Sequence, residues 1–138
     1  MKRKIKFRGK DIKTGEWHYG HFFQRLGHYP AIIHPRPHNG KIRYFEDAVE
    51  DETVGQFTGL YDKNGKEIYE GDIIIEKLRR ARKDGERLVI CFDDFEWQGK
   101  NANDTTTSLS LLLEYHTIEV VGNIHDNPEL LKGGSDEK

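Results

Sequence analysis

Cysteine is almost absent from this chain of 138 residues, and its scarcity excludes two classes of small protein. Cys91 stands alone, so neither an intramolecular disulfide framework nor a four-cysteine zinc site can form. Long apolar runs are missing too. No stretch approaches the roughly 18 consecutive apolar residues of a membrane-spanning helix, and no apolar segment follows the basic N-terminus. We therefore expect a cytosolic protein with no membrane partner.

The chain also lacks an excess of charge of either sign. It has 22 basic and 24 acidic residues, and the formal net charge of -2 gives no general attraction to nucleic acid or to an anionic membrane. Any such binding must be local. Charged residues make up 33% of the chain, yet the 11% of aromatic residues can bury enough area to form a core. One core of this size leaves little room for an added catalytic domain.

Short alternating apolar stretches between glycine turns favour antiparallel hairpins over helices. The strongest hairpin signal is Asn64-Gly65, which separates expected strands at residues 54–60 and 66–69. The β-branched run 73–75 is expected to be a buried strand. Near the end, the sequence 126–129 has the capping residue, proline and carboxylate that begin a short helix. We predict a mainly β (β-rich α+β) fold of antiparallel hairpins with a short C-terminal helix.

Three further segments carry more specific predictions. Prolines bound the short apolar stretch 31–33, which favours an edge strand or a loop there. The alternation of Leu109, Leu111, Leu113 and Tyr115 predicts a strand, with a bulge or turn near residues 116–117. Five acidic residues within 46–52 predict a solvated connector or a short exposed helix. We place a boundary there, between an N-terminal β-hairpin lobe at 1–52 and a second lobe at 53–138.

A spaced pattern, F-x-G-x-x-x-K-x-G-x-x-x-Y, occurs at residues 7–19 and again at residues 57–69. Both copies are expected to be hairpins. Two explanations remain open: glycine turns between aromatic strands can look alike by chance, or a β unit has been duplicated.

Several segments resemble the YopX family of phage and prophage proteins. The stretches 55–60 (GQFTGL) and 62–73 (DKNGKEIYEGDI) are similar to the family signature, and 5–8 and 119–130 agree in order. The resemblance therefore spans nearly the whole chain. It implies a β-rich fold with a small SH3-like roll or barrel in the second half, and it allows one continuous domain at 5–131 in place of two lobes. It also implies a phage or prophage accessory protein in the bacterial host cytosol, and it implies no reaction.

A basic segment around the expected turn at Asp84-Gly85 is the clearest local candidate for a binding site. Clustered guanidinium and ammonium groups bind phosphates and gain from counterion release, so nucleic acid is one expected partner. A protein or subunit contact and a solvated surface stay open, because hairpin tips are commonly charged and no aromatic residue stands beside these for stacking. The candidate residues are Lys77, Arg79, Arg80, Arg82, Lys83 and Arg87.

Residues that often carry chemistry are present without a telling arrangement. Five histidines fall close together, but local spacing puts neighbouring ones on opposite strand faces or would need a helix to align them, so we expect surface histidines and no metal. The carboxylates of Asp93, Asp94 and Glu96 are expected to solubilise the end of a strand, and Cys91 to be a small buried hydrophobe. The five histidines are His18, His21, His28, His34 and His38.

The sequence thus favours a non-enzymatic interaction module with no cofactor, acting on a protein partner or by self-association. Two alternatives remain. One is a nucleic-acid-binding protein that uses the basic segment and the basic N-terminus. The other is an enzyme of unknown class, which would need carboxylates and histidines to converge in a pocket.

Overall fold

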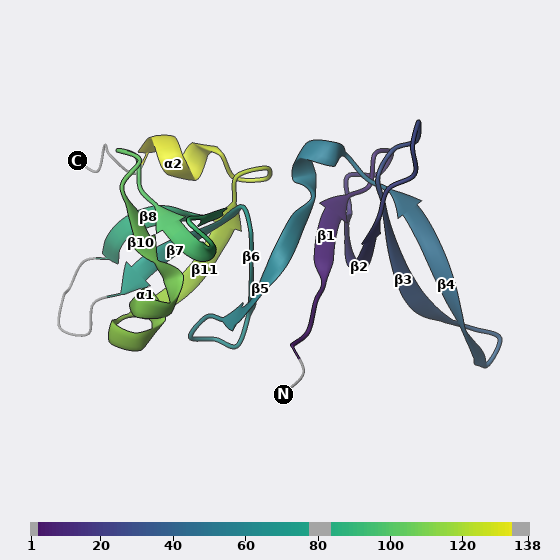
Figure 1. Cartoon of the computed structure of the whole chain (residues 1–138), viewed down its shortest axis with the longest axis horizontal. Coiled ribbons are helices and arrows are strands. Elements are labelled where there is room, and N and C mark those ends of the chain that lie inside the picture. The colour runs from purple at the N-terminus through teal and green to yellow at the C-terminus, as the bar shows by residue number, and fades with distance from the viewer. Residues whose placement is uncertain (1–2, 78–83, 134–138) are drawn as a thin grey trace. The chain divides into compact units, whose positions relative to one another are not determined.

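A computed structural model describes residues 3–77 and 84–133 of the chain, which divides into two compact units, Met1–Phe57 and Thr58–Lys138 (Figure 1). Both units are built from antiparallel strands with few helices, so the predicted mainly β fold is confirmed. In the described parts of the chain, no helix is long and apolar enough to cross a membrane.

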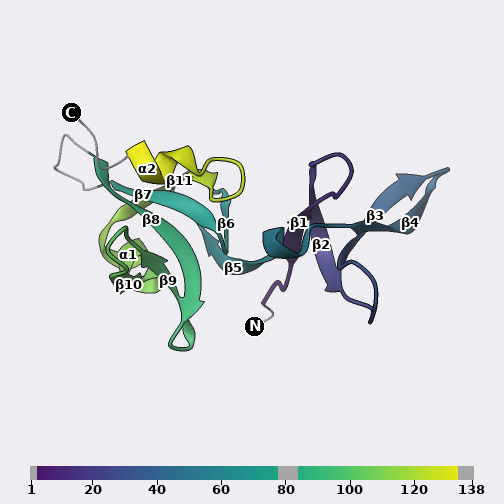
Figure 2. The same cartoon turned by 90° about the horizontal axis from the view of Figure 1, so that it is seen from above.

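Unit 1 is a sheet in which the strands follow one another in the order β4-β3-β2-β1-β5. Strand β2 pairs with β1 through Trp17–Gly20 and with β3 through His21–Phe23, so it changes partner along its length. Beyond β2 the β3–β4 hairpin continues alone (Figures 1 and 2). The elements are β1 (Phe7–Lys10), β2 (Trp17–Phe23), β3 (Ala31–His38), β4 (Lys41–Ala48), η1 (Asp51–Thr53) and β5 (Gly55–Tyr61).

The prediction of an edge strand or loop at residues 31–33 is wrong, because β3 lies between β2 and β4. The prolines are tolerated for a reason of register. The N–H of Val49 donates to the carbonyl of Pro30, so the even-numbered residues of β3 direct their backbone N–H and C=O groups toward β4. The backbone nitrogens of Pro35 and Pro37 therefore point away from β4. Pairing with β2 ends at Ile33, so β2 does not need the N–H groups that the two prolines lack.

The acidic run at 46–52 is only partly the connector that its composition predicts. Residues 46–48 belong to β4, and Val49 after them is fully buried. The run then ends in the short helix η1, where the hydroxyl of Thr53 donates to the carbonyl of Glu50 and accepts from the N–H of Lys10. These contacts bind the end of the run to the unit 1 sheet.

Unit 2 holds a five-stranded sheet with the order β10-β9-β8-β7-β11, and the end of β5 neighbours β6. The predicted hairpin at 54–69 is confirmed, and so is the buried strand at 73–75, whose isoleucines are at most 8% exposed. The C-terminal helix also begins where predicted. The SH3-like barrel stays a prediction. The elements are β6 (Glu67–Tyr69), β7 (Asp72–Lys77), β8 (Asp84–Asp93), β9 (Glu96–Lys100), β10 (Thr106–Ser108), α1 (Leu109–Tyr115), β11 (Thr117–Asn123) and α2 (Glu129–Gly133).

Helix α1 contradicts the strand predicted from alternating leucines. Leu109 and Leu112, three apart, are buried in the core of unit 2, while Leu111 is 50% exposed. This is the spacing of one helix face, and Leu112 is the residue that the alternation passes over. The change of phase near residue 116 is the junction between α1 and β11, and the irregularity in β11 lies instead between Val120 and Gly122.

Both copies of the repeated pattern form hairpins, as expected. Their turn glycines, Gly15 and Gly65, have φ of 76° and 80°, the left-handed conformation that glycine adopts without strain. The duplication itself stays a prediction.

Candidate functional site

The basic segment predicted as a binding site is only partly described. Arg79, Arg80, Arg82 and Lys83 lie outside the described residues. Lys77, at the end of β7, has its ammonium 3.6 Å from the carboxylate of Glu119 in β11. Arg87, in β8, donates from Nη1 to the carbonyl of Leu130 in α2 at 2.6 Å. The two described members therefore contact their own unit, and the role of the segment stays a prediction.

The cysteine and the three carboxylates named from the sequence lie in β8 and at the turn that joins it to β9. Asp93, Asp94 and Glu96 are exposed at the β8–β9 turn, where Asp94 and Phe95 have φ of 50° and 65°. Cys91 is half-buried, less than expected, and burial raises the pKa of its thiol. A raised pKa disfavours the thiolate, the form that acts as a nucleophile.

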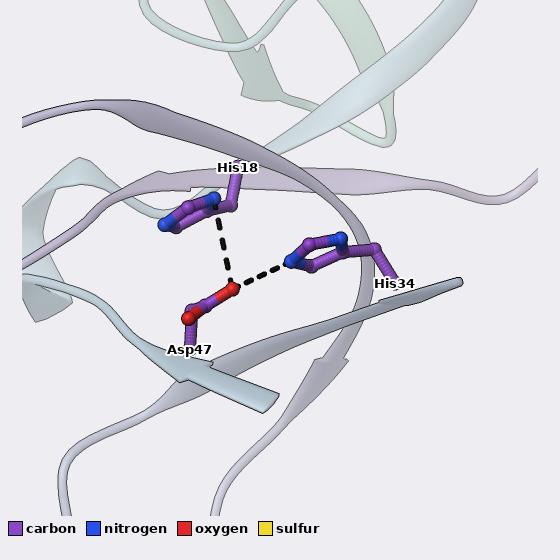
Figure 3. Close-up of side chains that lie close together, drawn as sticks. All are labelled: His18, His34 and Asp47. Atoms are coloured by element: carbon purple, nitrogen blue, oxygen red, sulfur yellow. Dashed lines mark hydrogen bonds and ion pairs between the residues drawn. The ribbon is translucent and has the colours of Figure 1, made fainter. Parts of the chain in front are cut away.

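The structure does bring together three side chains that local spacing did not connect: His18 from β2, His34 from β3 and Asp47 from β4 (Figure 3). The registers explain this. Phe22 lies opposite Ile32, and Ile32 lies opposite Asp47, so these residues share one face of the sheet. His18 and His34 lie on that face too, because residues two or four apart on a strand point the same way.

Gly20 allows the approach of the two histidines. A Cβ built on Gly20 would lie 2.2 Å from the carbonyl oxygen of Ile33 and 3.2 Å from Cβ of His34. Only glycine leaves room for β3 to pass this close to β2. The imidazole rings then lie nearly parallel, at 13°, with their centroids 5.3 Å apart.

Carboxylates hold both imidazoles. One oxygen of Asp47, Oδ2, is 2.6 Å from Nε2 of His34 and 3.8 Å from Nδ1 of His18. The other nitrogen of His18, Nε2, is 2.9 Å from the carboxylate of Asp11. Exposed fractions of 11% for the His18 side chain, 13% for His34 and 26% for Asp47 leave the group largely shielded from water.

Asp11 follows β1, and its carboxylate also accepts hydrogen bonds from the N–H groups of Lys13 and Thr14. The bond with His18, helped by those two backbone bonds, lowers the pKa of Asp11 to about 2. A carboxylate that stays ionised fixes the orientation of the His18 ring.

An arginine completes the group. Nη2 of Arg36 lies 3.1 Å from Oδ2 of Asp47 and 3.2 Å from Nε2 of His34. The Arg36 side chain is 47% exposed, so its guanidinium is a cation held at the mouth of the cluster. We call His18, His34, Asp47, Asp11 and Arg36 together the histidine cluster.

The histidine cluster can do two things. It ties together three neighbouring strands and the segment after β1, as a structural crosslink. It also presents two imidazole nitrogens and a carboxylate oxygen within 4.8 Å of one another, a ligand set that suits a transition-metal ion. Sequence reasoning missed Asp11, Arg36 and Asp47. The signal that was overlooked is Asn39-Gly40, a two-residue hairpin turn with φ of 50° and 77° that fixes the β3–β4 register.

Comparisons with known proteins agree with this architecture. A crystal structure of protein EF1440 from Enterococcus faecalis is 25% identical, with a TM-score of 0.60 over 94% of this chain and 99% of that one. Protein yopX from Bacillus subtilis is 21% identical, with a TM-score of 0.59 over 91% of this chain and 97% of that one. No curated protein matches the sequence. The sequence model of the YopX protein family matches residues 6–132, and the chain therefore belongs to this family.

Proposed function

We propose that this protein is a non-enzymatic interaction module of phage type that binds a protein partner through the outer part of the β3–β4 hairpin. We call this part, residues 35–44, the arm. The observation that carries the proposal is that the arm has one apolar face and one basic face, both exposed. A hairpin that only had to be soluble would not need an apolar face in water.

The apolar face is formed across the two strands. Pro35 lies opposite Tyr44, and Pro37 lies opposite Ile42. Ile42 is 63% exposed and Tyr44 is 68% exposed, and both prolines are exposed as well. Aromatic and aliphatic side chains grouped in this way are typical of the centre of a protein interface.

The basic face lies on the opposite side of the same strands. Arg36 is paired with Arg43, and His38 with Lys41, while residues 35–44 include no acidic side chain. Like charges directly opposite one another destabilise a strand pair. Arg36 is already paired with Asp47, so Lys41 and Arg43 are the cations of this face that a partner's carboxylates would meet, and the face favours an acidic partner surface.

The proposal includes no reaction. The thiol of Cys91 has a raised pKa, which disfavours the nucleophilic thiolate, and the carboxylates of Asp93, Asp94 and Glu96 lie exposed at a turn, where charged side chains commonly serve solubility. The exposed apolar and basic faces of the arm therefore favour partner binding over catalysis as the function of this protein.

The test compares proteins recovered from host cells by tagged wild-type chain and by two double variants. Ile42→Ser with Tyr44→Ser changes the apolar face, and Leu26→Ser with Leu111→Ser changes two other exposed leucines, which are 98% and 50% exposed. We expect a partner recovered by wild type and by the leucine control but lost from the arm variant. Equal recovery by all three would contradict the assignment to the arm.

Nucleic acid is a second candidate partner, favoured by the basic face of the arm. Lys41 and Arg43 are exposed, and phosphate binding by such residues weakens steeply as salt rises. A fluorescent duplex or single strand would bind the wild type at low ionic strength and lose affinity in Lys41→Gln with Arg43→Gln. An absence of binding at low salt would exclude this alternative.

A further inference from the structure

We infer that His18, His34 and Asp47 form a binding site for one zinc-class transition-metal ion, with Arg36 occupying the position of the ion when no metal is bound. The three ligands lie outside the arm, so the inference does not rest on partner binding there, and Arg36 alone belongs to both features. No sequence spacing indicates the site, because its three members come from three strands.

The donor set selects the class of ion. Two imidazole nitrogens and one carboxylate oxygen suit Zn²⁺ and its neighbours in the first transition row. Ca²⁺ requires about six to eight oxygen ligands, and Mg²⁺ prefers oxygen and water, so neither fits a group dominated by nitrogen. Three protein ligands leave a fourth tetrahedral position for water or for a group from a partner.

Two of the three distances between ligand atoms are close to those that a tetrahedral ion needs, and all three atoms lie within 4.8 Å of one another. With bonds of about 2.0–2.1 Å, neighbouring ligand atoms lie roughly 3.3 Å apart. Oδ2 of Asp47 lies 3.8 Å from Nδ1 of His18 and 2.6 Å from Nε2 of His34, one distance longer and one shorter than this. Shifts well below 1 Å would correct both distances. Because the two rings are nearly parallel, one imidazole must also rotate so that the lone pairs of both ligating nitrogens point at the ion.

The surroundings of His18 match those of a metal ligand. Its Nδ1 faces Asp47, while its Nε2 is 2.9 Å from the carboxylate of Asp11. Metal-bound histidines commonly donate their remote N–H to a carboxylate in this way, which fixes the tautomer and makes the ligating nitrogen more basic. Asp11 is thus a positioning residue for the site.

Arg36 places a positive charge beside two of the three ligands. Its Nη2 lies 3.1 Å from Oδ2 of Asp47 and 3.2 Å from Nε2 of His34, the two ligand atoms that are nearest to each other. An incoming cation must displace it. The side chain is 47% exposed and can leave toward solvent, so Arg36 weakens metal binding without preventing it.

The inference is tested by titrating the full, tag-free chain with Zn²⁺ in a calorimeter and with Co²⁺ by visible absorption. We expect one ion per chain and the intense Co²⁺ bands of tetrahedral coordination. His18→Gln, His34→Gln and Asp47→Asn should each lose at least tenfold in affinity. Asp11→Asn should lose about tenfold, as is usual for a residue that orients a ligand.

Two kinds of variant separate metal binding from a folding defect. Arg36→Gln should bind Zn²⁺ more tightly than wild type, a gain that no loss of structure can produce. His28→Gln and His38→Gln remove exposed histidines outside the cluster and should bind as wild type does. The inference is overturned if the wild type shows no saturable binding, if the controls lose as much as His34→Gln, or if Arg36→Gln binds more weakly.

Discussion

Asp62 should be among the most sensitive positions in unit 2, because one buried carboxylate holds two segments that are far apart in sequence. Its Oδ1 accepts from the N–H groups of Asn64 and Lys66 within the β5–β6 turn, at 2.8 and 2.9 Å. Its Oδ2 accepts from the N–H of Val120 in β11 at 3.0 Å. Asp62 is 6% exposed, so water cannot replace these bonds.

Asp62→Asn keeps the shape of the side chain and changes one contact. The amide oxygen can still serve the turn, but the amide nitrogen then faces the N–H of Val120, and two donors meet. The change removes a charge-assisted hydrogen bond and leaves a buried donor unsatisfied. We expect a loss of about 2–4 kcal/mol in the free energy of unfolding, from the usual worth of each effect. Asp62→Ala removes all three hydrogen bonds, so it should lower the free energy of unfolding by at least as much.

The measurement is urea unfolding followed by tryptophan fluorescence. Trp97 packs against the core of unit 2 and Trp17 belongs to unit 1, so Trp17→Phe gives a background in which the signal reports unit 2 alone. Glu96→Gln, which changes an exposed carboxylate at a turn, is the matched control and should cost less than about 0.5 kcal/mol. Equal midpoints for Asp62→Asn and Glu96→Gln would refute the reasoning.

Acid provides a second readout of the same carboxylate. Burial alone would raise the pKa of Asp62, but the N–H groups of Val120, Lys66 and Asn64 outweigh it and hold the pKa below its ordinary value of 3.8. A carboxylate with a lowered pKa stabilises the fold above that ordinary value, and the contribution is lost as the pH falls through the pKa of the folded state. The difference in stability between wild type and Asp62→Asn should therefore shrink below pH 3.8. A constant difference down to strong acid would show that the charge of Asp62 is not the cause.

Three further variants test the packing. Leu112→Ala should cost about 2–5 kcal/mol and Leu111→Ala under about 0.5, because only Leu112 is buried; equal costs would mean that α1 does not exist in solution. Gly20→Ala should destabilise unit 1 and separate the two imidazoles, which histidine ring chemical shifts by NMR would report, and unchanged shifts would contradict the close approach of β3. Thr53→Val should lower the free energy of unfolding by about 1–2 kcal/mol, because the hydrogen bonds to Glu50 and Lys10 are lost. Urea unfolding followed by the fluorescence of Trp17 measures this loss.

The elements that could be predicted from the sequence are those set by local chemistry. Asn64-Gly65 fixes a turn, three consecutive isoleucines need burial on both faces, and proline after a capping residue begins α2. Helix α1 was missed because a seven-residue leucine-rich segment satisfies two periodicities, and only the position of Leu112 against the core selects the helix. Tertiary packing makes that choice.

The histidine cluster could not be predicted from spacing along the chain, since it depends on pairing between strands. His34 and Asp47 are thirteen residues apart and meet only because Asn39-Gly40 sets the register of β3 and β4. His18 then requires Gly20, whose missing side chain permits the crossing of β2 and β3. Recognition of the Asn39-Gly40 turn predicts the contact between His34 and Asp47, though not the position of His18.

The orientation of Pro35 and Pro37 limits how copies of the arm can stack. A continuing cross-β ribbon needs two open edges on every molecule, so that each copy both receives a strand and offers one. Past Ile33, the outward edge of β3 lacks donors at both prolines and cannot receive a strand in register. Only the edge of β4 is left, so edge-to-edge association would end with a pair of copies facing one another. The arm can therefore expose apolar side chains without forming a continuous cross-β ribbon through its edges.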